Sequence, residues 1–352
     1  MRKASDVTEC GRARDLTRKE LLGLALGGVS FAALLSILRF EGHGLGGMAG
    51  TARAAEVARP TVLDATSTST RIVEIAAGVF VHQGQLGVYS PANGGDICNT
   101  GFIIGRDAVA VIDTGGTAHL GAAMKAKIES LTNRPIRYVI NTHMHPDHVL
   151  GNAAFRSEGT QFVGHHKLGP ALAARAERYL AFNREAVGTE AFAGTEIVLP
   201  TMMVVDRLEI DLGGRKLLLN ARPTAHTDND LTVRDATTDT AFLGDLIFAG
   251  HVPTLDGSIR GWLALLAALE TETAGRIVPG HGPASMDWPG AAAPVRRYLT
   301  AIADGVRQAI RDGRTLREAI ETVGNEERDN WLLFDEFHRR NVSAAFAELE
   351  WE

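Results

Sequence analysis

Residues 141–148 read Asn-Thr-His-Met-His-Pro-Asp-His, so that three histidines and one aspartate lie within six positions. The preceding residues 137–140, Arg-Tyr-Val-Ile, end in an apolar run typical of a buried strand. The segment therefore follows a strand directly, in a loop of the kind that rigid scaffolds use to hold functional side chains. Imidazole and carboxylate groups together favour a borderline cation such as Zn²⁺. The pattern His-x-His-x-Asp-His thus predicts a metal site.

Further histidines and one aspartate recur where later strands are expected to end. The segments are Ala225-His226-Thr227, Leu243-Gly244-Asp245 and Pro279-Gly280-His281-Gly282. Each of these motifs is weak by itself, because a lone histidine is usually an ordinary core or surface residue. Their order after the 141–148 segment is what favours a functional role for His226, Asp245 and His281.

Strand and helix patterns alternate from residue 71 onward. Short apolar runs predict strands at 71–75, 79–83, 101–104, 108–112, 136–140, 161–163, 207–211, 216–220, 230–234, 240–243 and 276–278. Helical apolar spacing predicts helices at 117–132, 148–156, 167–186, 259–270, 291–311, 315–323 and 328–349, with a Thr315-x-x-Glu318 capping box. Mixed strands with intervening helices predict an α/β fold, a sandwich of two sheets with helices outside.

The composition is that of a globular protein with a sizeable core, since 45% of the 352 residues are hydrophobic and 22% are charged. The chain carries a net charge of −6 and its first 54 residues carry +3, which leaves −9 for the remainder. An acidic main body disfavours nucleic acid and anionic membranes as partners. Of the two cysteines, only Cys98 lies in the main body, where we expect a small buried hydrophobic residue rather than a ligand.

The first 54 residues have the pattern of an export signal. A charged start is followed by residues 21–38, which contain no charge, and residues 51–55 offer an A-x-A cleavage site after Ala54. Residues 17–22, Thr-Arg-Lys-Glu-Leu-Leu, resemble a twin-arginine export motif with lysine in the second basic place. We therefore expect a periplasmic or secreted protein. The competing interpretation is an uncleaved membrane anchor, because an apolar stretch of 18 residues is just long enough to cross a bilayer.

Taken together, T-H-M-H-P-D-H from residue 142, A-H-T from 225, L-G-D from 243 and P-G-H-G from 279 resemble the metallo-β-lactamase superfamily over about residues 71–290. The resemblance implies a four-layer αβ/βα sandwich with two metals in a cleft at one edge of the sheets. The implied ligands are His143, His145 and His226 for the first metal, Asp147, His148 and His281 for the second, and Asp245 as the bridge between them. The implied cofactors are two Zn²⁺, with iron or manganese as alternatives.

On this interpretation the chain comprises an export signal (1–54), a linker (55–70), a catalytic domain (71–290) and a C-terminal helical extension packed on it (291–352). The expected function is that of a di-zinc hydrolase. A metal-bridging hydroxide attacks an ester, thioester, lactone or lactam, and Asp147 is both ligand and catalytic proton relay. Ile112-Asp113-Thr114-Gly115 also occurs in the superfamily, where Asp113 is expected to orient a ligand histidine.

A finer resemblance concerns four segments: Val81-His82-Gln83-Gly84, Pro91-Ala92-Asn93, residues 252–258 and residues 348–352. They are similar to the exported branch called quinoprotein relay system zinc metallohydrolases. That branch is associated with pyrroloquinoline-quinone-dependent alcohol oxidation in the periplasm. It implies a quinoprotein dehydrogenase system as a partner, beside a small-molecule substrate.

Two other functions compete with hydrolysis. One is an iron-dependent oxidoreductase similar to persulfide dioxygenases; among the iron relatives, flavodiiron proteins usually carry glutamate in place of His145. The other is a non-catalytic, metal-dependent accessory protein of a dehydrogenase system, which has no need for open metal positions. Around the site, His251 and Asp256 either line the substrate cleft or have ordinary roles. Two interpretations of the long loop 84–100 stay open: it caps that cleft, or it is an ordinary connection.

Overall fold

The computed structural model describes residues 71–352 of the protein. The predicted export signal and linker lie outside these residues. Within the described range, no helix combines the length and the apolar character needed to span a bilayer.

The first sheet has seven strands in the order in which they occur along the chain, β1 to β7. The first four strands pair antiparallel, whereas β4, β5, β6 and β7 pair parallel. The strands are β1 (Ile72–Ala76), β2 (Val79–His82), β3 (Thr100–Ile104), β4 (Val109–Ile112), β5 (Ile136–Ile140), β6 (Gln161–His165) and β7 (Met202–Val204).

The second sheet has five strands in the order β12-β11-β10-β9-β8. Its pairs are antiparallel except for β11 and β12, which run parallel. The strands are β8 (Arg207–Asp211), β9 (Lys216–Ala221), β10 (Leu231–Asp235), β11 (Thr240–Phe248) and β12 (Arg276–His281).

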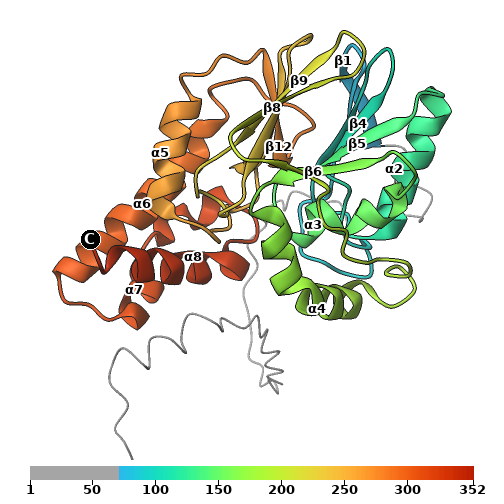
Figure 1. Ribbon diagram of the computed structural model, residues 1–352. Helices are drawn as coiled ribbons and strands as arrows, with labels where there is room; N and C mark the ends of the chain where they lie inside the picture. The colour runs from blue at the N-terminus through green and yellow to red at the C-terminus, as the bar shows by residue number, and fades with distance from the viewer. Residues whose placement is uncertain (1–70) are drawn as a thin grey trace, which may run out of the picture. The chain divides into compact units, whose positions relative to one another are not determined.

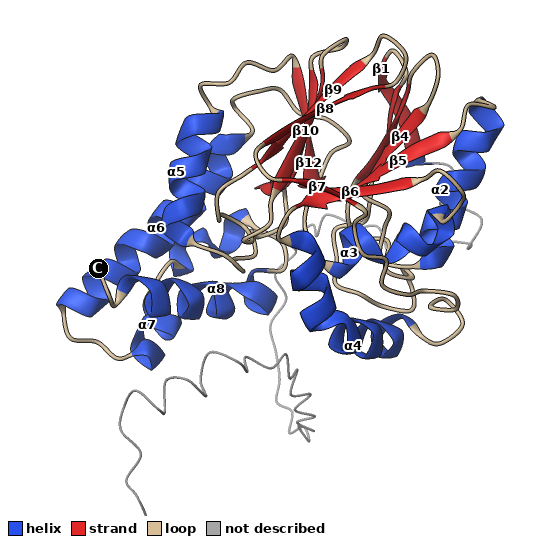
Figure 2. Ribbon diagram, viewed as in Figure 1, coloured by secondary structure: helices blue, strands red, loops and turns tan. Residues whose placement is uncertain are grey.

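Helices cover the outer face of each sheet (Figure 2). Those associated with the first sheet are α2 (Ala118–Leu131), α3 (Pro146–Val149), the 3₁₀ helix η2 (Leu150–Phe155) and α4 (Leu168–Val187). Those associated with the second sheet are α5 (Ile259–Leu269), α6 (Ala292–Arg311), α7 (Leu316–Thr322), the 3₁₀ helix η3 (Asn325–Asn330) and α8 (Phe334–Leu349).

Four apolar clusters hold the described layers together, and three of them lie against the sheets. The cluster between the sheets joins side chains of both, among them Ile103, Ile140, Leu219, Val233 and Phe242. Alternation along β4 places Ala110 and Ile112 in this cluster and Val109 and Val111 in the cluster under α2. The third and largest cluster lies between the second sheet and helices α5, α6 and α8. The predicted sandwich of two sheets with helices outside is therefore confirmed.

Some predicted elements differ from the observed ones at their ends. The predicted strand 240–243 runs on to Phe248 as β11, so Asp245 lies within the strand rather than after it. The predicted helix 148–156 is the single turn α3, which Pro146 begins, followed by η2. The predicted helix 328–349 begins only at Phe334, because Leu333 has a left-handed backbone (φ 58°) that no α-helix accommodates. Strand β7 was missed because it is only three residues long.

Candidate metal centre

The seven predicted metal ligands come from four places in the chain and meet at one edge of the sandwich. The carboxyl ends of the parallel strands β4 and β5 lie side by side, so the segment after Ile140 starts at that edge. Strands β11 and β12 are also parallel, which brings Asp245 and His281 to the matching edge of the second sheet. His226 lies in the connection between β9 and β10.

The first cluster consists of His143, His145, His226 and Asp245, as predicted for the first metal. Asp245 Oδ2 lies 3.7 Å from His143 Nε2 and 3.4 Å from His226 Nε2. His145 Nδ1 lies 3.0 Å from His226 Nε2. Three imidazole nitrogens and one carboxylate oxygen therefore surround one point.

The second cluster shares Asp245 with the first and adds His148 and His281. His148 Nε2 lies 3.1 Å from Asp245 Oδ1, and His281 Nε2 lies 3.3 Å from Asp245 Oδ2. Asp147 completes this group, because its Oδ2 lies 3.6 Å from His148 Nε2 and 3.4 Å from His281 Nε2. The structure thus brings together all seven predicted residues, with Asp245 between the two halves.

These spacings fit metal ions. Tetrahedral ligands on Zn–N and Zn–O bonds of about 2.0–2.1 Å lie about 3.3–3.4 Å apart, close to the distances in both clusters. Several atoms at the centre are also buried without a hydrogen-bond partner: His143 Nε2, His148 Nε2 and Asp245 Oδ1. Buried polar atoms nearly always have a partner, so these three atoms are consistent with a bound metal ion at this place.

The charges of the centre complement a cation. Burial lowers the pKa of His143 well below its usual value and that of His226 to about 3, so both rings are neutral and offer lone pairs. Burial raises the pKa of Asp245, but His281, His148 and His143 outweigh it and hold that pKa well below the usual range. Asp245 is therefore a carboxylate among imidazoles.

Asp113 orients His148, as predicted. Its Oδ2 lies 2.8 Å from His148 Nδ1, which leaves Nε2 to face the second cluster. The carboxylate also accepts hydrogen bonds from the backbone N–H of Thr142 at 2.8 Å and from its hydroxyl at 2.7 Å. Asp113 itself has a left-handed backbone (φ 54°), which turns its side chain into the site.

Three other predicted ligands have a hydrogen-bond partner on their outer ring nitrogen. The sequence patterns either did not single out these partners or left their roles open. His281 Nδ1 lies 2.8 Å from the carbonyl oxygen of Ile97, so the loop 84–100 holds this side chain. His226 Nδ1 lies 2.7 Å from the carbonyl oxygen of Thr254. His145 Nε2 lies 3.0 Å from Asp256 Oδ2, which gives Asp256 a place behind a ligand. The two carbonyl partners could not be predicted from the sequence, because every residue has a backbone carbonyl.

Two glycines allow the strands to approach closely at the centre. A Cβ added to Gly280 would lie 1.9 Å from Asp245 Oδ1, which is far inside van der Waals contact. A Cβ added to Gly244 would lie 2.7 Å from Thr142 Oγ1, and Gly244 also has a left-handed φ of 53°. Gly280 of the P-G-H-G motif thus leaves room for Asp245, and Gly244 of the L-G-D motif leaves room for Thr142.

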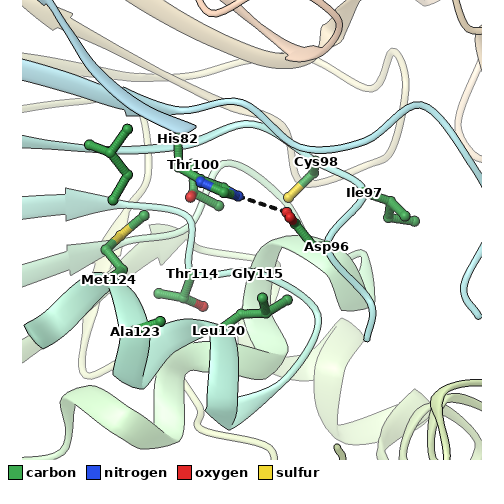
Figure 3. A pocket seen from close by; sticks show the side chains of 11 residues that line it. His82, Asp96, Ile97, Cys98, Thr100, Thr114, Gly115, Leu120, Ala123 and Met124 are labelled. Carbon is green, nitrogen blue, oxygen red and sulfur yellow. Dashed lines mark hydrogen bonds and ion pairs between the residues drawn. The ribbon is translucent and has the colours of Figure 1, made fainter. Parts of the chain in front are cut away.

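Cys98 is buried, as predicted, but it lies beside the second cluster. Its thiol donates to the carbonyl oxygen of Asp147 at 2.9 Å, and it groups with Asp147 and His148. Cys98 also lines a small cavity with His82 and Asp96, whose side chains pair at 2.7 Å (Figure 3). Its position at the centre was not foreseen, because a single cysteine in a loop carries no spacing.

Comparison with protein families gives one match. A sequence model described as the metallo-beta-lactamase superfamily matches residues 93–281, a range that contains all seven predicted ligands. No curated protein matches the chain in sequence.

Solved structures share the fold. A metallo-beta-lactamase from Pontibacter korlensis aligns with a TM-score of 0.52 at 18% identity, over 65% of this chain and 98% of that one. The structure of TMB-1 aligns with a TM-score of 0.51 at 19% identity, over 65% and 96%. The stereoselective inverting sec-alkylsulfatase Pisa1 from Pseudomonas sp. gives 0.61 at 15% identity, over 79% of this chain and half of that one. At identities of 15–19%, these structural similarities show a common fold and nothing about activity.

Proposed function

The chain belongs to the metallo-beta-lactamase superfamily, and from that premise we propose that it is a hydrolase that uses two zinc ions. The observation that carries the proposal is the position of Asp245, whose carboxylate faces three imidazole nitrogens of the two clusters through Oδ2 and a fourth through Oδ1. A single shared carboxylate between two ligand sets is the arrangement expected of a two-metal site. It has no use in a closed structural zinc site, which takes four ligands around one ion.

In this proposal the first ion is held by His143, His145 and His226, the second by Asp147, His148 and His281, with Asp245 common to both. When bound, such a pair of ions supplies an activated water at neutral pH and polarises the oxygen of the substrate. Seven protein ligands leave coordination positions open to water and substrate.

The protein's own residues orient the ions and move protons. Asp113 and the carbonyls of Ile97 and Thr254 fix which imidazole nitrogen faces each ion. Asp147 is the residue that we propose as proton relay. It lies at the start of α3, is only 7% exposed, and reaches His148 and His281 with the same oxygen. Its second oxygen is left to accept a proton from the water and pass it to the leaving group.

The substrate class that we propose is an ester, thioester, lactone or lactam. The acidic net charge of residues 55–352 supports a small-molecule substrate rather than nucleic acid. We further propose export to the periplasm by residues 1–54 and a role beside a quinoprotein dehydrogenase system. The support for these two proposals is the export pattern and the four segments similar to the quinoprotein relay branch.

The test is metal analysis combined with a substrate panel. Protein purified from its natural compartment should contain about two zinc ions per chain by mass spectrometry, as a two-metal site requires. It should hydrolyse at least one of a thioester, a lactone and a chromogenic cephalosporin. Full zinc content without turnover of any of them would instead favour an accessory protein. Bound iron with oxygen consumption would favour the oxidoreductase.

A matched pair of variants separates the site from the rest of the protein. His145→Ala should abolish turnover and lower the zinc content while the circular dichroism spectrum stays that of the parent. His119→Ala, which removes an exposed histidine on α2, should leave both unchanged. Activity retained in His145→Ala would contradict the assignment.

A further inference from the structure

The loop 252–258, between β11 and α5, lies directly behind the first cluster. The carbonyl oxygen of Thr254 accepts a hydrogen bond from His226 Nδ1 at 2.7 Å. The carboxylate of Asp256 lies 3.0 Å from His145 Nε2. Two of the three histidines of the first cluster are therefore held from behind by the same short loop.

These two contacts decide which ring nitrogens face the cluster. A carbonyl oxygen only accepts, so His226 carries its proton on Nδ1 and presents a lone pair on Nε2. The carboxylate of Asp256 likewise accepts a hydrogen bond from the Nε2–H of His145, which leaves a lone pair on Nδ1. The two lone pairs then face each other at 3.0 Å, and a metal ion between them would satisfy both.

Helix α8 holds this loop from the other side. The side chain of Asn341, which is only 1% exposed, accepts from the backbone N–H of Leu255 at 2.9 Å and donates to the carbonyl oxygen of Pro253 at 2.6 Å. Arg340 donates to the second oxygen of Asp256 at 3.3 Å. Pro253 and Leu255 flank Thr254, which contacts His226. Asp256 contacts His145 directly.

A later residue of α8 secures the end of the same loop. Glu348 accepts hydrogen bonds from the Ser258 hydroxyl and from the backbone N–H of Ile259, both at 2.8 Å. It therefore caps the first turn of α5 from outside that helix. The loop 252–258 is thus tied to α8 at both ends.

The second cluster has different supports. His148 is held by Asp113 after β4, and His281 is held by the carbonyl oxygen of Ile97. Neither of these two residues belongs to α8 or to the loop 252–258. The ring of His281 also stacks on His251, which contacts Phe337 of α8, so Phe337 is a contact of α8 on the side of the second cluster. Helix α8 also lies outside residues 93–281, the range that matches the superfamily.

We propose that α8 is a positioning element for the first metal, acting through the loop 252–258 on His145 and His226. The proposal rests on the two-metal function proposed above. It assigns Arg340, Asn341 and Asp256 as positioning residues, none of which is a ligand. Loss of Asp256 or Arg340 should weaken the first metal and spare the second, because Asp256 contacts His145 and Arg340 contacts Asp256.

The experiment is a Co²⁺ titration of the metal-depleted full-length protein against a competing chelator, followed by absorption spectroscopy. Asp256→Ala should weaken binding of one of two ions by about 10–100-fold, the usual cost of removing a partner behind a ligand histidine. Arg340→Ala should weaken the same ion by less, and Arg340→Lys should restore part of the loss because a lysine still offers a cation to Asp256. Arg339→Ala, an exposed neighbour on α8, should match the parent.

The identity of the weakened site is read from reference variants. The spectrum of the ion lost from Asp256→Ala should match that lost from His143→Ala and differ from that lost from His281→Ala. Equal weakening of both ions in Asp256→Ala, or parental binding in both Asp256→Ala and Arg340→Ala, would overturn the proposal. If the parent itself bound fewer than two ions, the two-metal function would fail instead, so the two failures are distinguishable.

Discussion

The carboxylate of Asp245 lies among the imidazoles of four histidines. Its Oδ2 is 3.7 Å or less from nitrogens of His143, His226 and His281, and its Oδ1 is 3.1 Å from His148. Rotation of this one side chain would therefore disturb both clusters together. What holds it in place is tight backbone packing, because Gly280 on β12 leaves no room between the strand and the carboxylate.

That contact predicts the effect of a single methyl group. Gly280→Ala would place a Cβ 1.9 Å from Asp245 Oδ1, so the carboxylate must move. We expect metal affinity to fall by about 10–100-fold, as when other supports of metal ligands are removed, and turnover to fall with it. Metal content after dialysis against a chelator measures the first effect.

The matched control is Gly290→Ala. Gly290 is exposed, and a Cβ added there meets no atom within 4 Å. This variant should keep the metal content of the parent. Equal behaviour of the two glycine variants would show that the close approach of β12 to Asp245 does not matter.

At the scale of elements, the ends of strands and helices decide where side chains lie. Strand β11 carries Asp245 in its interior and shifts register at Gly244, which turns the carboxylate toward the cluster. The chain enters α3 at Pro146, so that Asp147 and His148 occupy its first turn. Helix α7 begins at a capping box of Thr315 and Glu318, as the sequence predicts.

The capping box predicts the local stability of α7. The Thr315 hydroxyl accepts from the Glu318 N–H at 3.3 Å, and the Glu318 carboxylate accepts from the Thr315 N–H at 2.7 Å. Thr315→Ala should speed amide hydrogen exchange in residues 316–322 about fivefold, because a lost N-cap typically costs ~1 kcal/mol. Thr315→Ser keeps the hydroxyl and should exchange like the parent. Exchange that is unchanged in Thr315→Ala would show that packing on α8 alone holds α7.

Across the whole molecule, α7 and α8 pack beside α6 on the side of the second sheet (Figure 1). Helix α8 also reaches the loop 252–258 behind the first cluster. Glu327 is a polar connection between η3 and α6. Its side chain is 6% exposed and pairs with Arg297 of α6 through both oxygens, at 2.8 and 2.9 Å. It also accepts from the Trp331 indole at 3.0 Å.

This network predicts a pH dependence of stability. The hydrogen bonds from Arg297 hold the pKa of Glu327 below its usual value, against the opposing effect of burial. A carboxyl with a depressed pKa stabilises the fold above its unfolded pKa of about 4.3 and loses that contribution as the pH falls through its folded pKa. Glu327→Gln should therefore lower the free energy of unfolding at pH 7 by about 1–2 kcal/mol, since Arg297 is half exposed.

Chemical denaturation at pH 7 and pH 3.5 checks this prediction. The difference between parent and Glu327→Gln should shrink at the lower pH. Glu326→Gln, an exposed neighbour, should match the parent at both values. A difference that stays constant with pH would mean that Glu327 acts by shape and not by charge.

The amino-acid sequence is enough to predict the class of fold and the seven residues that meet at the centre. Apolar periodicity placed most strands and helices, because alternation and helical spacing are local properties of the chain. The His-x-His-x-Asp-His segment and the three later motifs named seven residues that the structure brings together. Those motifs are short and carry their chemistry in their side chains, so they can be read without a fold.

The contacts behind these seven residues depend instead on how the chain packs in three dimensions. The carbonyls of Ile97 and Thr254, the place of Cys98 and the reach of α8 to Asp256 depend on backbone paths between segments far apart in the chain. A backbone carbonyl is the same in every residue, so the sequence does not mark the ones that accept hydrogen bonds from the site. A single cysteine or arginine belongs to no motif, so its position in the sequence does not indicate a role at the site. Such contacts arise when two sheets and their helices pack, and they have no local pattern in the sequence.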